Sequence, residues 1–162
     1  MKSRMLLALL LAVIMTPARI CSQPKPDFSG TWKQSKERST VRRTGNVTLQ
    51  IEHRDPELTV ETTMVRDFAG PGHANQHYTT DGKVSVSTGA DGDEFHTSIV
   101  WSGQSLVFTI EEHEDGRILL SRETWTLIEN GAALQRVREG AKGSPDSTTK
   151  QTLIYLRGAP QT

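Results

Sequence analysis

The sequence predicts an all-β protein, a single up-and-down antiparallel β-barrel of about 8–10 strands that follows an N-terminal signal peptide. Polar and apolar residues alternate through most of the chain after the first 28 residues, and no helical periodicity interrupts them. Pairs of turn-forming residues, such as Asp115-Gly116 and Asn130-Gly131, separate neighbouring apolar runs. Strands joined by tight turns leave two exposed edges unless the sheet closes on itself, which favours a barrel.

The N-terminal segment is predicted to be a signal peptide covering residues 1–22, which leaves residues 23–162 as the barrel domain. Lys2 and Arg4 precede an unbroken apolar run at residues 5–15. This run is too short for a helix to cross roughly 30 Å of hydrocarbon, although an uncleaved anchor is the alternative. We therefore expect an exported protein, periplasmic or secreted, with no membrane span in its mature form.

Cleavage after Ala18 or after Ser22 fits the small residues that follow the apolar run. Removing residues 1–22 takes away three basic residues and no acid, so the formal net charge falls from 0 to −3. Without a basic surplus, nucleic acid is not an expected partner. Cys21 is the chain's one cysteine, so stability has to come from packing and not from an internal disulfide.

Ten strands are expected, and the long segment 68–75, rich in glycine, is expected to be a loop. The strands are predicted at residues 29–34, 46–53, 57–65, 76–80, 83–87, 94–101, 104–112, 117–128, 132–139 and 149–157. Two-residue turns are predicted at Asp55-Pro56, Asp81-Gly82, Ser102-Gly103, Asp115-Gly116 and Asn130-Gly131.

These turns predict which residues lie opposite each other, because a two-residue loop fixes the register of a hairpin. The predicted pairs are Ile99 with Leu106, Thr97 with Phe108, Glu123 with Phe108, Arg136 with Trp125, and Arg138 with Glu123. All of them share one mostly apolar face, which should point into the barrel. If Val84 and Val86 also point inward, the Asp81-Gly82 turn adds His77 to this face.

Three charged residues on an otherwise apolar face are the most informative feature for function: Glu123, Arg136 and Arg138. Buried charges are costly unless they are paired or hydrated. An arginine left without an acid could bind a carboxylate, while the apolar rows would hold a tail or ring. The predicted ligand-binding residues are Phe108, Glu123, Trp125, Arg136, Arg138, Trp101 and His77.

Two other interpretations remain open at this stage. In a purely structural one, Glu123 pairs with Arg138 and Arg136 lies on the Trp125 ring near a wet barrel mouth, where both pairs only fix the register, or else side chains fill the barrel. In a catalytic one, Glu123 has a perturbed pKa and moves a proton beside an arginine. No catalytic residue is predicted, because the usual nucleophile motifs are missing. The oligomeric state is left open.

Neither a metal site nor a cofactor is predicted, although the chain has five histidines. His96 faces outward in the predicted register, and His113 lies in an acidic run at a hairpin tip, where charges are usually solvated. His73 and His77 are four residues apart, a spacing that brings ligands together only on a helix.

The segment Gly30-Thr31-Trp32 resembles the Gly-x-Trp opening of lipocalins and their calycin relatives. The resemblance implies that Trp32 lies at the closed base of the barrel with a basic residue of the last strand, here Arg157, packed over it. The Trp101-Ser102-Gly103 turn also resembles small exported bacterial proteins of unassigned function.

The strand count is closer to the fatty-acid-binding branch of the calycins, whose first two strands flank a two-helix lid. Residues 35–45 are too short and polar for such a lid. The resemblance implies a barrel for a small hydrophobic or amphipathic ligand. The calycin-type enzymes that pair a carboxylate with an arginine, such as phenolic acid decarboxylases, illustrate the catalytic alternative.

Overall fold

A computed structural model describes residues 24–40, 45–66, 69–89, 91–140 and 150–158. The strands are β1 (Gly30–Ser35), β2 (Asn46–Arg54), β3 (Glu57–Arg66), β4 (Ala69–Thr79), β5 (Asp81–Thr88), β6 (Glu94–Ser102), β7 (Ser105–Glu114), β8 (Arg117–Ile128), β9 (Ala133–Gly140) and β10 (Gln151–Arg157), with the short 3-10 helix η1 (Glu129–Gly131) after β8. The predicted signal peptide, its cleavage sites and Cys21 lie outside these residues. No helix in the described part of the chain is long and apolar enough to span a membrane.

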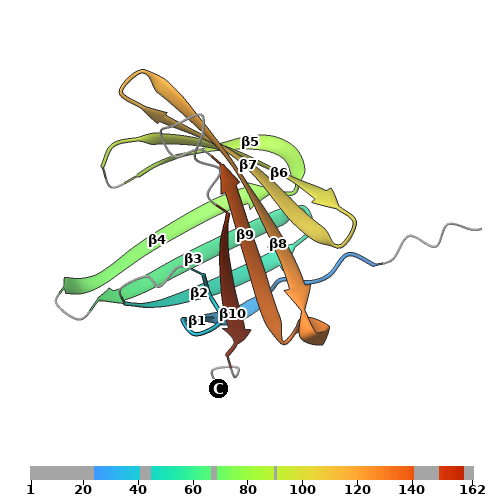
Figure 1. Cartoon of the computed structure of the whole chain (residues 1–162). Helices are drawn as coiled ribbons and strands as arrows, with labels where there is room; N and C mark the ends of the chain where they lie inside the picture. Colours follow the sequence, from blue (N-terminus) through green and yellow to red (C-terminus); the bar gives the residue numbers. More distant parts are fainter. Residues whose placement is uncertain (1–23, 41–44, 67–68, 90, 141–149, 159–162) are drawn as a thin grey trace, which may run out of the picture.

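The strands form one antiparallel sheet in the order β4-β3-β2-β1-β10-β9-β8-β7-β6-β5. Pairing of β1 with β10 joins the two ends of the chain, and the sheet curls into a nearly closed barrel (Figure 1). The predicted fold class is therefore confirmed. Ser35 ends β1, and residues 36–38 form a turn where the fatty-acid-binding branch carries its lid; residues 41–44 lie outside the described part.

The prediction that Asp81-Gly82 makes a hairpin is wrong. β4 pairs with β3 and β5 pairs with β6, but β4 and β5 are the two edges of the sheet. Thr80 fixes the corner between them, because its amide donates to the Pro56 carbonyl at 2.9 Å and its hydroxyl donates to Asp55 Oδ1. The two strands thus separate from an anchored corner.

The predicted loop at residues 68–75 is also wrong, since β4 begins at Ala69. Gly70 and Pro71 lie where the register between β3 and β4 shifts, and β4 is an edge strand. A proline costs no ladder hydrogen bond at an edge or a bulge, so it does not end the strand there. Phe68 is outside the described residues.

The turn between β6 and β7 is Gly103-Gln104 and not Ser102-Gly103. Ser102 pairs with Ser105, so Ile99 lies opposite Phe108, two residues away from the predicted register. A shift of two residues leaves every side chain on its predicted face.

The other two registers are confirmed. Glu123 lies opposite Phe108 and Arg138, and Trp125 lies opposite Arg136. The Asp115-Gly116 turn has two positive φ angles, 48° and 75°, as its residue types predict. The loop after β8 is longer than expected, because Ile128 pairs with Ala133 around η1.

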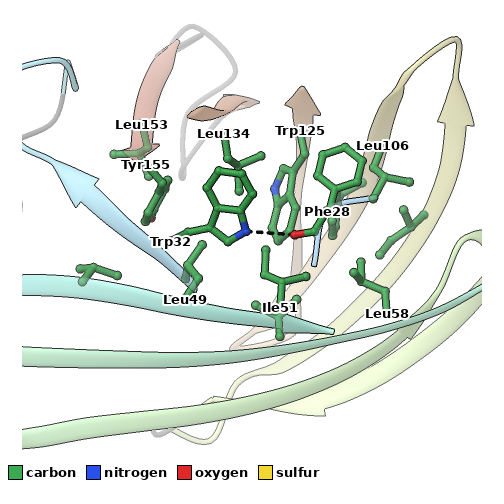
Figure 2. Packing of buried hydrophobic residues seen from close by; sticks show 14 residues of the cluster. Phe28, Trp32, Leu49, Ile51, Leu58, Leu106, Trp125, Leu134, Leu153 and Tyr155 are labelled. Atoms are coloured by element: carbon green, nitrogen blue, oxygen red, sulfur yellow. Dashed lines mark hydrogen bonds between the residues drawn. The ribbon is translucent and has the colours of Figure 1, made fainter. Parts of the chain in front are cut away.

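One end of the barrel, which we call the base, holds the Asp55-Pro56 turn, the Gly103-Gln104 turn and η1, and it is packed solid. Trp32 is fully buried and its Nε1 donates to the Phe28 carbonyl at 2.9 Å (Figure 2). The buried residues drawn around this pair come from both halves of the barrel: Leu49, Ile51, Leu58, Leu106, Trp125, Leu134, Leu153 and Tyr155.

Arg157 covers Trp32, with its guanidinium carbon 4.2 Å from the ring centroid, as the resemblance implies. It also donates to the Ser29 carbonyl at 2.7 Å and to the Gly131 carbonyl at 2.9 Å. Gly30 has a φ of 133°, and a Cβ there would lie 2.8 Å from Arg157 Nη1. Glycine at this position is therefore what allows the arginine to reach the base.

Candidate ligand-binding cavity

Above the base, the barrel encloses a cavity of about 540 Å³. Its walls come from β3 and β4 on one side of the gap between β4 and β5, from β5 and β6 on the other side, and from the facing strands β7, β8 and β9. The lining residues are Val60, Thr62, His73, Ala74, Asn75, Gln76, Tyr78, Ser87, Thr88, Gly89, Phe95, Thr97, Phe108, Ile110, Glu123, Trp125, Arg136 and Arg138. Side chains therefore do not fill this part of the barrel interior.

Glu123 is the buried acid of the cavity, with 5% of its surface exposed. Its Oε1 accepts one hydrogen bond from Trp125 Nε1 and one from Arg136 Nε, both at 2.5 Å. The Arg136 guanidinium carbon lies 4.6 Å from the Trp125 ring centroid and 5.6 Å from that of Tyr155. Glu123, Trp125 and Arg136 thus form one connected unit.

Burial is the largest single influence on the pKa of Glu123 and would raise it. The charge of Arg136, its hydrogen bond, the Trp125 hydrogen bond and the charge of Arg138 outweigh burial, and the pKa lies below its usual range. Burial acts against the charge of Arg136 as well, yet Glu123 raises the pKa of that guanidinium further above its usual value. Both groups are therefore ionised at neutral pH. A general acid would need the opposite shift in Glu123.

Arg138 differs from Arg136, although it lies two residues away on the same face of β9. It is opposite Glu123 in the register, but its Nη2 donates to the Ser121 hydroxyl at 3.1 Å. Within the described residues, no carboxylate oxygen comes within 4.0 Å of its guanidinium. The acid that was expected to pair with Arg138 pairs with Arg136 instead, which leaves Arg138 as the cation available at the cavity.

The walls around these charges are aromatic. The Phe108 ring lies 4.6 Å from Trp125 and meets Tyr78 edge-on at 6.0 Å. Burial raises the pKa of Tyr78 to about 12, so its hydroxyl stays protonated and can donate a hydrogen bond at neutral pH. The cavity therefore combines flat apolar surfaces with a hydroxyl and a guanidinium.

Five of the seven predicted site residues come together at the cavity: Phe108, Glu123, Trp125, Arg136 and Arg138. Trp101 does not line it. Its Nε1 donates to Asp55 Oδ1 at 2.8 Å at the base, and its ring lies 6.0 Å from Phe28. Trp101 does lie on the inward face, as predicted, but its side chain is too close to the base to reach the cavity.

His77 was predicted to face inward, and this is wrong. It lies opposite Thr59, with Nδ1 3.1 Å from the Thr59 hydroxyl on the exposed side. Val84 and Val86 also point outward, each 60% exposed. The cause is the assumed orientation of β5, since Val84 and Val86 lie on the outer face and His77 lies on that face with them.

The even-numbered residues of β4 are among the lining residues that the sequence did not predict. Tyr78 lies opposite the buried Leu58, and Gln76 lies opposite the buried Val60. The Asp55-Pro56 turn could have revealed them, because continuing its register from β2 through β3 gives the inward side of β3.

No model of a protein family matches the chain, and no curated protein matches it either. Several solved structures do match the chain. The REP1-NXSQ fatty acid transporter is 13% identical, with a TM-score of 0.58 over 82% of this chain and 97% of that one. Fatty-acid-binding protein 1 of Echinococcus granulosus is 14% identical, with a TM-score of 0.57 over 82% and 98%.

Secretory abundant heat soluble protein 4 of Ramazzottius varieornatus is 11% identical, with a TM-score of 0.63 over 85% of this chain and all of that one. At such low identity these likenesses show the fold. The chain has a ten-stranded antiparallel barrel with the same fold as these proteins.

Proposed function

We propose that this protein is exported and that its barrel binds a small amphipathic molecule with an anionic group. In this proposal Arg138 binds the anion, while the rings of Phe108, Trp125 and Tyr78 contact the apolar part. The observation that carries the proposal is the position of Arg138, an arginine that lines a cavity of about 540 Å³ and has no carboxylate partner among the described residues.

The cavity has the volume of a ligand site, since pockets for small molecules have volumes of roughly 300–1,000 Å³. Its lining is mixed, with polar residues on several strands, while the carboxylate and the two guanidinium groups lie on β8 and β9. An anionic group at Arg138 would form a charge-assisted hydrogen bond away from bulk water.

The pairing of Glu123 with Arg136 supports binding and not proton transfer. A catalytic Glu123 would have to exchange its proton near neutral pH, and the two hydrogen bonds on Oε1 favour its ionised form. The pair also balances the charge of Arg136, whose Nε already donates to Glu123. Arg138 is consequently the residue that decides the charge preference.

The similar structures agree with this ligand class. Among them are proteins described as fatty acid transporters or fatty-acid-binding proteins, one of them from Schistosoma mansoni in complex with arachidonic acid. Export rests on a separate argument, the basic start and apolar run of residues 2–15. N-terminal sequencing of the protein secreted by cells would test export and locate the cleavage site.

The binding proposal is tested by titrating the purified protein with fatty acids and aromatic acids while following tryptophan fluorescence. Trp125 lines the cavity, so an occupant should change its emission. We expect saturable binding of acids that weakens about tenfold or more in Arg138→Gln, the loss expected for a charge-assisted hydrogen bond.

The matched control is Arg122→Gln, which removes an arginine from the exposed face of β8, opposite Glu139. It should leave the affinity unchanged. Methyl esters of the same acids should bind wild type and Arg138→Gln equally. No saturable change with any acid, or equal losses in both arginine variants, would contradict the proposal.

A further inference from the structure

On the outer face of the barrel, two histidines and two glutamates form a compact square across β6 and β7, which we call the outer cluster. His96 lies directly opposite Glu111, and Glu94 lies directly opposite His113. Alternation places these side chains outside, because Phe95, between Glu94 and His96, and Ile110, next to Glu111, line the cavity.

The histidine rings lie face to face, with centroids 4.4 Å apart and planes inclined by 34°. His96 Nε2 is 2.5 Å from Glu94 Oε1. His113 Nε2 is buried and has no hydrogen-bond partner within the part of the chain that the structure describes; Glu111 Oε2 lies 3.8 Å away. A buried ring nitrogen without a partner is costly, which points to a group that the protein itself does not supply.

We propose that His96, Glu111 and His113 bind a divalent transition-metal ion of the Zn²⁺ or Cu²⁺ class. One ligand atom from each residue lies within 4.8 Å of the other two. Bonds of about 2.0–2.2 Å to a tetrahedral ion require ligand atoms roughly 3.4 Å apart, so small side-chain rotations suffice to close the site. Two imidazole nitrogens and one carboxylate oxygen suit these ions.

The surroundings favour a cation at this position. Glu94 adds a second carboxylate within reach of His96, so two acids balance the charge of a divalent ion. The neighbours on the outer face are apolar: Val86 lies opposite His96, Leu120 opposite Glu111, and Ile118 opposite His113. The basic side chain nearby, Arg117, lies 3.4 Å from Glu114 and not in the cluster.

The test is Zn²⁺ titration by calorimetry on untagged protein in a Cys21→Ser background, which removes the chain's one thiol as a competing ligand. We expect one saturable site, and at least a tenfold weaker affinity in His96→Gln, His113→Gln and Glu111→Gln. Loss of a ligand should cost no less than loss of a supporting contact, for which about 10–100-fold is typical. Bound Cu²⁺ should show coupling to two imidazole nitrogens by electron paramagnetic resonance.

The control is His77→Gln, which removes an exposed outward histidine of β4 outside the outer cluster. It should bind Zn²⁺ as wild type does. Zn²⁺ should raise the thermal unfolding midpoint of wild type and not that of His113→Gln, while the midpoints without metal stay close together. No saturable binding by wild type, or equal affinity in wild type and all three cluster variants, would overturn the proposal.

Discussion

The base and the cavity are two halves of one barrel, and they differ in where their charged side chains lie. At the base, Arg157 is exposed, lies on the buried Trp32 and donates to two backbone carbonyls, so its charge stays at the surface outside a packed apolar layer. In the cavity, Glu123 and Arg136 face the interior as an ion pair, with Arg138 beside them.

The difference shows how one sheet can provide both stability and a site. Large side chains converge where the base turns meet, and close packing there favours folding. The polar residues of β8 and β9 leave space instead, at the cost of desolvating charge. Stability should therefore depend most on the base, and ligand preference on the cavity.

The largest expected effect is loss of stability from Trp32→Ala. The ring is fully buried and packs under Arg157, so its removal should cost about 3–5 kcal/mol in the free energy of unfolding. Urea unfolding measures it. Ile118→Ala, at a residue that is 62% exposed, is the control and should change stability by less than about 0.5 kcal/mol. Equal effects would remove the distinction between base and surface.

The next largest loss of stability is expected from Glu123→Gln, which removes the charge that balances Arg136. Breaking a buried ion pair from one side costs roughly 3 kcal/mol, because the other charge is left without compensation. The double variant Glu123→Leu, Arg136→Met should recover most of this loss. A stable Glu123→Gln variant with an unchanged urea midpoint would show that the pair is hydrated and not buried.

The smallest effect concerns His53, a buried histidine at the base. Burial lowers its pKa, and this outweighs the opposite influence of Asp27 and Asp55. Below about pH 6.5 the unfolded chain therefore binds a proton that the folded protein resists, so stability should fall as the pH falls. His53→Asn should flatten the dependence of the unfolding midpoint on pH between 7.5 and 5. His77→Asn, at an exposed site, should retain the wild-type slope.

Much of the fold and part of the site could be predicted, because turn residues act locally. Asp115-Gly116 and the loop after β8 fix registers that bring Glu123, Trp125 and Arg136 onto one face, and the structure has these pairs. Which arginine meets the acid was beyond prediction, since that depends on side-chain rotamers and not on register.

The failures have physical causes as well. The chain does change direction just before Asp81-Gly82, at Thr80, but whether the flanking strands then pair depends on barrel closure, which no local signal encodes. The two-residue error at Gly103-Gln104 left faces intact, but it placed Glu94 opposite Glu111 and His96 opposite Thr109, in place of the pairs Glu94 with His113 and His96 with Glu111. The outer cluster was missed for that reason, although its four residues lie in two short segments of the sequence, 94–96 and 111–113.

The measurement that tests the central claim most directly is a crystal structure of the protein grown with a fatty acid or aromatic acid that it binds. The account predicts the acid inside the barrel, its carboxylate within hydrogen-bond distance of the Arg138 guanidinium, and Glu123 still bonded to Arg136. A carboxylate bound to Arg136 with Glu123 displaced, or an acid bound only outside the barrel, would contradict it.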